Sequence, residues 1–275
     1  MSATTSHAAA PTRGSGIPFG RHVRVELRKM IDTRAGAWLL GITAGLVVLA
    51  AAIALIVVMF DDNARLTADA LSQIMAGMLS VLLPVIAITA VTGEWGQRTV
   101  LTTFALEPHR GRVIGAKYVS VLILALATIV LAVVIGVVCN VLGAAIGGYD
   151  VAWNIDVSDL LWTIGMQLAY FTMAFCLGLL FLSTPVAVSV FYVVALLLPF
   201  MVYGILYFAF GWARDLIPWL DMQYASVPLI TGRDMNDNPV DVSALEWIRF
   251  VFTLFLWIVL PGGIGLRRAL TTEVK

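Results

Sequence analysis

Charged side chains are scarce in this chain of 275 residues, because Asp, Glu, Lys and Arg make up only 12% of it. Soluble domains have about a quarter of their residues charged and about half apolar, whereas 60% of this chain is hydrophobic. The scarcity excludes an ordinary soluble domain and predicts a membrane protein. The net charge is zero, so bulk charge gives no reason to expect a nucleic-acid partner, and none is predicted.

Sequence motifs for catalysis and nucleotide binding are also missing. The chain has no HExxH zinc motif, no GxSxG nucleophile elbow and no GxxxxGK[ST] phosphate loop, so it does not bind ATP by that device. Its two cysteines, Cys139 and Cys176, lie in apolar runs without a CxxC pair or a nearby histidine. We therefore expect no catalytic residue, no metal, no cofactor and no enzymatic activity in the chain itself.

Ionisable residues are nearly absent between the ends of the apolar segments. Lys117 and Arg249 lie near segment ends, where we expect their side chains to extend to the interface. Proton-driven transporters usually need a carboxylate or histidine within the membrane, so any energy for transport is expected to come from a second protein. Polar residues such as Gln73 and Gln167 are expected to bond to neighbouring helices, and lining a substrate path is the alternative.

Six apolar segments are long enough for membrane spans, each of which needs roughly 20 helical residues. The sequence therefore predicts an all-α, polytopic fold. The Ser183-Thr184-Pro185 link predicts a tight helical hairpin, because proline fits the first turn of a new helix. The predicted spans are about 35–60, 70–93, 113–142, 158–182, 185–210 and 246–266, and together they form a transmembrane domain over 35–266.

The region before the first span divides into two parts. Residues 1–17 are small and polar and are predicted to form a disordered tail. Residues 18–34 predict an amphipathic helix, with cations on one side and with apolar residues at helical spacing on the other (Phe19, Val23, Leu27, Met30 and Ile31). Such a basic helix suits the surface of an anionic leaflet; packing on a soluble core is the alternative, but the chain has no such core.

The Lys and Arg residues are unevenly distributed between the two sides of the membrane on which the links between the predicted spans lie. With the amino terminus inside, 13 of the 17 Lys and Arg residues lie on the inner side, and most Asp residues lie on the other. The positive-inside rule therefore predicts that both termini are cytoplasmic, including a tail at 267–275. The outer segment 211–245 mixes tryptophans with aspartates and predicts short helices at the outer interface, either as a lid or as an aromatic belt.

The cytoplasmic link after the second span has an unusual pattern. It begins at Glu94 and precedes a span that starts no earlier than about Arg112. Val100, Leu101, Phe104 and Leu106 would lie on one face of a short helix, which a solvated loop does not need. The pattern therefore predicts docking, either on the membrane surface or on a partner protein.

Several residues of this link resemble the corresponding link of ABC-2 type permeases, the membrane subunits of ATP-binding-cassette exporters. The resemblance rests on Glu94, Arg98-Thr99, a short apolar helix, Pro108-His-Arg110-Gly-Arg112 and Lys117. The family usually has glycine before the threonine, where this chain has Arg98. The layout of the whole chain is also similar, with a basic helix, six spans, cytoplasmic termini and a longer outer segment before the last span.

The resemblance implies the permease subunit of an exporter in a bacterial cell membrane. The apolar, uncharged spans favour a hydrophobic or amphipathic substrate over a free ion. The resemblance implies a separate cytoplasmic ABC ATPase as partner and a second permease copy or paralogue within the lipid bilayer. It also implies that the link is the ATPase-coupling segment. The residues implied to contact the ATPase or to shape the link are Glu94, Arg98, Thr99, Phe104, Pro108 and Arg110.

Other interpretations of the same residues remain open. The positive-inside rule alone accounts for basic residues in a cytoplasmic link, such as Arg110, Arg112 and Lys117. Proline often ends a helix, which alone accounts for Pro108. The chain as a whole is also compatible with a secondary transporter or channel that needs no ATPase. A third interpretation is a membrane scaffold subunit that transports nothing.

Overall fold

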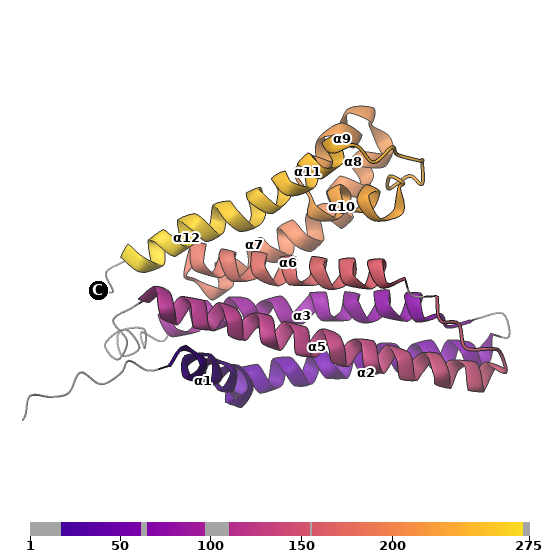
Figure 1. Cartoon of the computed structure of the whole chain (residues 1–275), viewed down its shortest axis with the longest axis horizontal. Coiled ribbons are helices and arrows are strands. Elements are labelled where there is room, and N and C mark those ends of the chain that lie inside the picture. The colour runs from indigo at the N-terminus through magenta and orange to yellow at the C-terminus, as the bar shows by residue number, and fades with distance from the viewer. Residues whose placement is uncertain (1–17, 62–64, 97–109, 155, 272–275) are drawn as a thin grey trace, which may run out of the picture.

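A computed structural model describes residues 18–61, 65–96, 110–154 and 156–271, and all regular elements in these ranges are helices (Figure 1). Two isolated β-bridges are the only strand-like pairings in the described residues. The all-α prediction is confirmed for this part of the chain. The elements are α1 (Phe19–Asp32), α2 (Arg34–Phe60), α3 (Ala68–Gly96), α5 (Arg110–Gly147), α6 (Val157–Phe181), α7 (Thr184–Tyr192), η1 (Val193–Tyr203), α8 (Gly204–Ala209), α9 (Gly211–Leu216), η2 (Ile217–Trp219), α10 (Met222–Thr231), α11 (Ala244–Leu254), η3 (Phe255–Val259) and α12 (Leu260–Thr271).

Six helical stretches are long and apolar enough to cross a membrane, as predicted. They are Arg34–Phe60, Ala68–Gly96, Arg110–Gly147, Val157–Phe181, Thr184–Ala209 and Ala244–Thr271. The third and sixth stretches extend past their predicted ends. The helical backbone continues through basic residues at the start of the third and the end of the sixth, and through a small-residue segment at 143–147. The chain is a multi-pass membrane protein.

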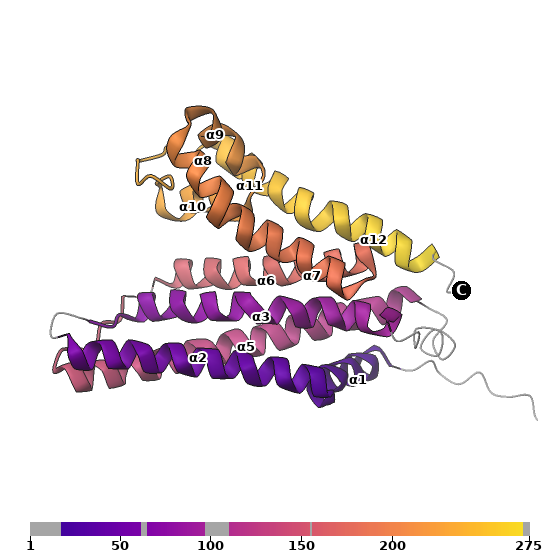
Figure 2. The same cartoon turned by 180° about the vertical axis from the view of Figure 1, so that it is seen from behind.

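The long helices pack closely at one end of the molecule and diverge at the other. The first end, which we call the α1 end, holds α1, the end of α3, the start of α5 and, on the other side of the bundle from α1, the end of α12 (Figures 1 and 2). α6 packs against both α3 and α12, and α7 packs against α6 and α3. The opposite end, which we call the α10 end, holds the short helices α8 to α11, tilted away from α6 (Figures 1 and 2).

Small residues allow the close packing of α6 between α3 and α12. A Cβ added at Gly265 of α12 would lie 2.6 Å from the backbone nitrogen of Leu180, and one at Gly178 would lie 3.3 Å from the carbonyl oxygen of Ile88. Backbones can approach this closely only where a side chain is missing, as is common in membrane helix bundles. The contact joins the α7–α12 part of the chain to the rest at the α1 end.

The turn between α6 and α7 is the predicted tight hairpin. Leu182 ends α6 in a left-handed conformation with φ 52°, and its N–H donates to the carbonyl of Gly178. Pro185 lies in the first turn of α7, where its missing N–H leaves no helical bond unmade. In the same span, Pro199 lies inside the π-helical segment η1, as is common where proline removes a helical hydrogen bond.

Candidate functional site

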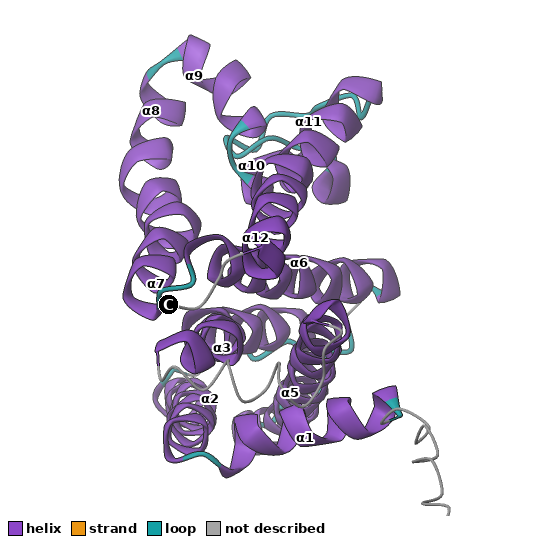
Figure 3. Cartoon of the chain, turned by 90° about the vertical axis from the view of Figure 1, so that its left-hand side faces the viewer, coloured by secondary structure: helices purple, strands orange, loops and turns teal. Residues whose placement is uncertain are grey.

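α1 runs across the ends of the long helices and packs on α5 and α2 (Figure 3). Of the apolar residues named for this helix, Met30 is buried and Val23 and Leu27 are partly buried, whereas Phe19 and Ile31 are exposed. The face that contains Met30 also contains Glu26, which is only 6% exposed. A carboxylate on an apolar face is unfavourable unless it finds partners, so its surroundings define the candidate site.

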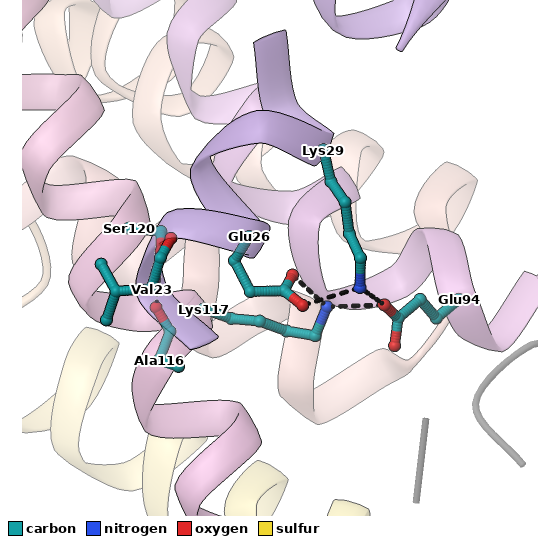
Figure 4. A network of polar contacts seen from close by, with 7 residues as sticks. All are labelled: Val23, Glu26, Lys29, Glu94, Ala116, Lys117 and Ser120. Carbon is teal, nitrogen blue, oxygen red and sulfur yellow. Dashed lines mark hydrogen bonds and ion pairs between the residues drawn. The ribbon is translucent and has the colours of Figure 1, made fainter. Parts of the chain in front are cut away.

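Four charged side chains from three helices form a closed cycle at this position, which we call the ion-pair ring (Figure 4). Glu26 accepts a bond of 2.7 Å from the Nζ of Lys29 on one carboxylate oxygen and another of 2.7 Å from the Nζ of Lys117 on the other. Oε1 of Glu94 accepts from the same two lysines, at 2.8 Å from Lys29 and 2.9 Å from Lys117. The ring therefore joins α1, the last turn of α3 and the second turn of α5.

A hydroxyl beside the ring adds a second attachment between α1 and α5. The fully buried Ser120 lies on α5, and its Oγ is 3.0 Å from the carbonyl oxygen of Val23 and 2.7 Å from that of Ala116 (Figure 4). These bonds lie one helical turn from Lys117, on the same face of α5. The docking of α1 on α5 thus has both an ionic and a neutral polar component.

The ring is electrically balanced, with two carboxylates and two ammonium groups. The side chains of Glu26 and Lys117 are each 8% exposed and that of Glu94 is 15% exposed, whereas that of Lys29 is 44% exposed. Partial burial alone would lower the pKa of Lys29, but its hydrogen bonds with Glu26 and Glu94 outweigh this effect and raise the pKa above its ordinary value. Lys117 is the buried cation on which both glutamates depend.

Among the described residues, the space beside the ring is too small to hold a ligand. A cavity lined by Val91, Glu94, Lys117 and Leu179, among others, has a volume of only about 10 Å³, which is at most room for one water molecule. The site therefore has the properties of a mechanical connection between helices, and not those of a small-molecule pocket.

The structure describes two of the six residues predicted for ATPase coupling, Glu94 and Arg110. Glu94 is a member of the ion-pair ring. Arg110 begins α5, and its Nη1 donates to the carbonyl of Leu270 in α12 at 3.1 Å. Arg98, Thr99, Phe104 and Pro108 lie outside the described residues, as do all four apolar residues of the predicted docking face.

The predicted extension of Lys117 to the membrane interface stays a prediction. The structure shows that its side chain is 8% exposed and that its ammonium group pairs with Glu94 and with Glu26 of α1. Glu26 was missed because the apolar pattern of 18–34 was assessed without it. A signal was present, since Glu26 lies three residues after Val23 and four before Met30, on the apolar face of the helix.

Comparisons with known proteins do not extend these findings. No protein-family model matches the chain, and no curated protein matches it. The resemblance to ABC-2 permeases therefore rests on the residues of the link and on the layout of the chain.

Proposed function

We propose that the chain is the membrane-spanning permease of an ABC exporter, and that it works with a separate cytoplasmic ATPase and with a second permease copy or paralogue. The ATPase docks on the link between α3 and α5. ATP binding closes the ATPase pair, displaces the link and α1, and so reshapes the space between the two permease copies. The exported substrate is hydrophobic or amphipathic.

The ion-pair ring is the observation that carries this proposal. Glu94 lies two residues before the end of α3, and Lys117 lies in the second turn of α5, so the ring connects both ends of the link to α1. Separating a buried ion pair leaves uncompensated charges and costs about 3–5 kcal/mol. A force applied to the link therefore moves the end of α3, the start of α5 and α1 together.

The distribution of charge supports the cytoplasmic placement of the α1 end. Arg21, Arg24 and Arg28 are exposed on α1, and the C-terminal half of α12 adds Arg267 and Arg268 at the same end (Figures 1 and 2). The α10 end instead carries most of the aspartates. By the positive-inside rule the α1 end faces the cytoplasm, where an ATPase reaches the link and where α1 lies on an anionic leaflet.

The test reconstitutes the chain in nanodiscs with the P-loop ATPase that is encoded beside it or co-purifies with it. ATP hydrolysis is measured for the wild type, for Arg98→Glu in the link and for Arg267→Glu as a matched charge reversal outside the link. We expect the chain to change the hydrolysis rate of the ATPase. We also expect Arg98→Glu to remove most of that change and Arg267→Glu to retain it.

Three results would overturn the proposal. Full coupling in Arg98→Glu would show that the link is not the docking segment. Transport by the purified chain with an ion gradient and no nucleotide would identify a secondary transporter or channel. A chain that neither binds an ATPase nor transports anything would be a scaffold subunit.

A further inference from the structure

A cavity of about 610 Å³ lies at the α10 end, between α3, α6 and α10. Its walls extend along α3 from Asp69 to Ser80 and along α6 from Asp159 to Tyr170, about 16 Å of helix in each case at 1.5 Å per residue. This is about half the thickness of the hydrocarbon core of a bilayer. The volume lies within the range of sites that hold drug-sized molecules, about 300–1,000 Å³.

Two polar atoms in the wall of the cavity have no hydrogen-bond partner among the described residues. Gln167 is 93% buried, since only 7% of it is exposed, and its Nε2 donates to the carbonyl of Ala76 at 2.7 Å. Its Oε1 is unpartnered, and so is the indole Nε1 of Trp162, which lines the same cavity. Buried polar groups in proteins almost always have partners, so these two atoms leave one acceptor and one donor of the wall unsatisfied among the described residues.

The charged groups of the wall are all negative. Asp69 and Asp159 lie in the first turns of α3 and α6, at the mouth of the cavity, and no lysine, arginine or histidine in the described part of the chain lines it. The carboxylate of Asp69 accepts from the Nε2 of Gln73, at 3.1 Å and 3.2 Å from its two oxygens. An amide neutralises no charge, so the mouth attracts cations.

Aromatic and apolar side chains lie among the polar ones of the wall. Trp162, Met166 and Tyr170 recur along α6, and Val227 and Ile230 line the cavity from α10. Aromatic faces attract organic cations, and the apolar side chains favour hydrocarbon. The cavity therefore combines two carboxylates, a hydrogen-bonding wall and an aromatic and apolar surface.

We propose that this cavity binds an amphipathic organic cation, with its charge near Asp69 and Asp159 and its apolar part against Trp162, Met166 and Tyr170. The inference rests on the proposed function only where it identifies this cation as the exported substrate. Binding itself needs no ATPase, so it is measured on the purified chain alone, and the two proposals can fail separately.

The experiment measures equilibrium binding of tetraphenylphosphonium to the chain in nanodiscs of zwitterionic lipid, with empty nanodiscs to subtract partitioning into the bilayer. Tetraphenylborate, which has the same shape and the opposite charge, is the matched probe. We expect saturable binding of the cation at one site per chain and at least tenfold weaker binding of the anion.

Variants locate the site. Asp159→Asn is on an exposed residue and should fold normally, and together with Asp69→Asn it should weaken cation binding about tenfold. Gln167→Met keeps the volume of the side chain, removes the unpartnered oxygen and should weaken binding about three- to tenfold. Asp241→Asn makes the same charge change on an exposed residue that does not line the cavity, so it should leave binding unchanged.

Several outcomes would overturn the proposal. Equal binding of both probes, or wild-type binding in the double aspartate variant and in Gln167→Met, would show that the cation binds elsewhere. No binding to a chain with a wild-type unfolding midpoint would also contradict it. A cavity that binds the probe only in the monomer, and not in a dimer, would belong to the interface with a second copy.

Discussion

The two ends of α3 illustrate opposite ways of placing a carboxylate in a membrane protein. At the α1 end, Glu94 lies in a balanced ring with two lysines, beside a space of about 10 Å³. At the α10 end, Asp69 lines a cavity of about 610 Å³ that has no described basic residue in its wall. The surroundings of Glu94 are closed, and its ring is neutral, whereas those of Asp69 are open and negative.

The helix dipole gives a physical reason for the difference. Asp69 lies in the first turn of α3, where the partial positive charge of the helix stabilises a carboxylate without a cation. Glu94 lies in the last turn, where the partial negative charge disfavours it. Glu94 is accordingly bound by two lysines, whereas the carboxylate of Asp69 accepts from the amide of Gln73 and lines the cavity.

The largest expected effect comes from removing the buried cation of the ring. Lys117→Met leaves Glu26 and Glu94 buried with only Lys29 to neutralise them, which should lower the free energy of unfolding by about 3–5 kcal/mol. The measurement is an unfolding titration in mild detergent, with Arg112→Met as the control on the same helix. Adding Glu26→Gln to Lys117→Met should restore part of the lost stability. If Lys117→Met alone were as stable as Arg112→Met, the ring would not be a buried charge cluster.

The next largest effect is expected where α12 packs against α6 at the α1 end. Gly265→Ala would place its Cβ 2.6 Å from the nitrogen of Leu180, so α12 must shift, and we expect a loss of about 1–3 kcal/mol. Gly263→Ala adds the same atom to open space and should stabilise the helix by about 0.5–1 kcal/mol. The difference in unfolding midpoint measures the close approach, and changes of the same sign in both variants would argue against it.

An effect of similar size that depends on pH is expected for Asp221, a buried carboxylate at the α10 end. Burial raises its pKa to about 6, although the N–H groups of Gln223 and Tyr224 hydrogen-bond to it. An unfolded aspartate titrates near pH 3.9, so the contribution of this group to stability is greatest below that pH and is lost as the pH rises to about 6.

Asp221→Asn should keep the N-terminal cap of α10 and abolish this pH dependence. We expect the variant to be about 3 kcal/mol more stable than the wild type at pH 7.5 and equal to it near pH 4. Thermal unfolding across this range measures the difference, and the exposed Asp241→Asn should follow the wild type. A constant difference at all pH values would show that Asp221 does not titrate in this range.

The smallest effect is expected for the exposed cation of the ring. Lys29→Met leaves Lys117 bound to both glutamates, and the side chain of Lys29 is 44% exposed, so its pairs are worth about 1 kcal/mol or less. The unfolding titration used for Lys117→Met applies here. A loss of stability as large as that of Lys117→Met would mean that the two lysines contribute equally. It would contradict the expectation that the more buried lysine contributes more.

Glu94 and Lys117 show how much of the candidate site was predictable. Glu94 was singled out as an ATPase-coupling residue by the resemblance of the link, and that role stays a prediction; its place in the ion-pair ring was not predicted. Lys117 was present in the same stretch, but its partner Glu26 is 91 positions away. Only the docking of α1 across α5 brings the two together, and no local pattern encodes that contact.

The sequence by itself determined the six helical stretches, the helix before them and the hairpin at Pro185. These features are local, since a bilayer selects runs of roughly 20 apolar residues whatever surrounds them. The tertiary structure alone decided which side chains face protein. Residues facing lipid are as apolar as those in the core, so periodicity within the spans carries little information about packing. For that reason the ion-pair ring and the cavity beside Gln167 emerged only when the helices were placed together.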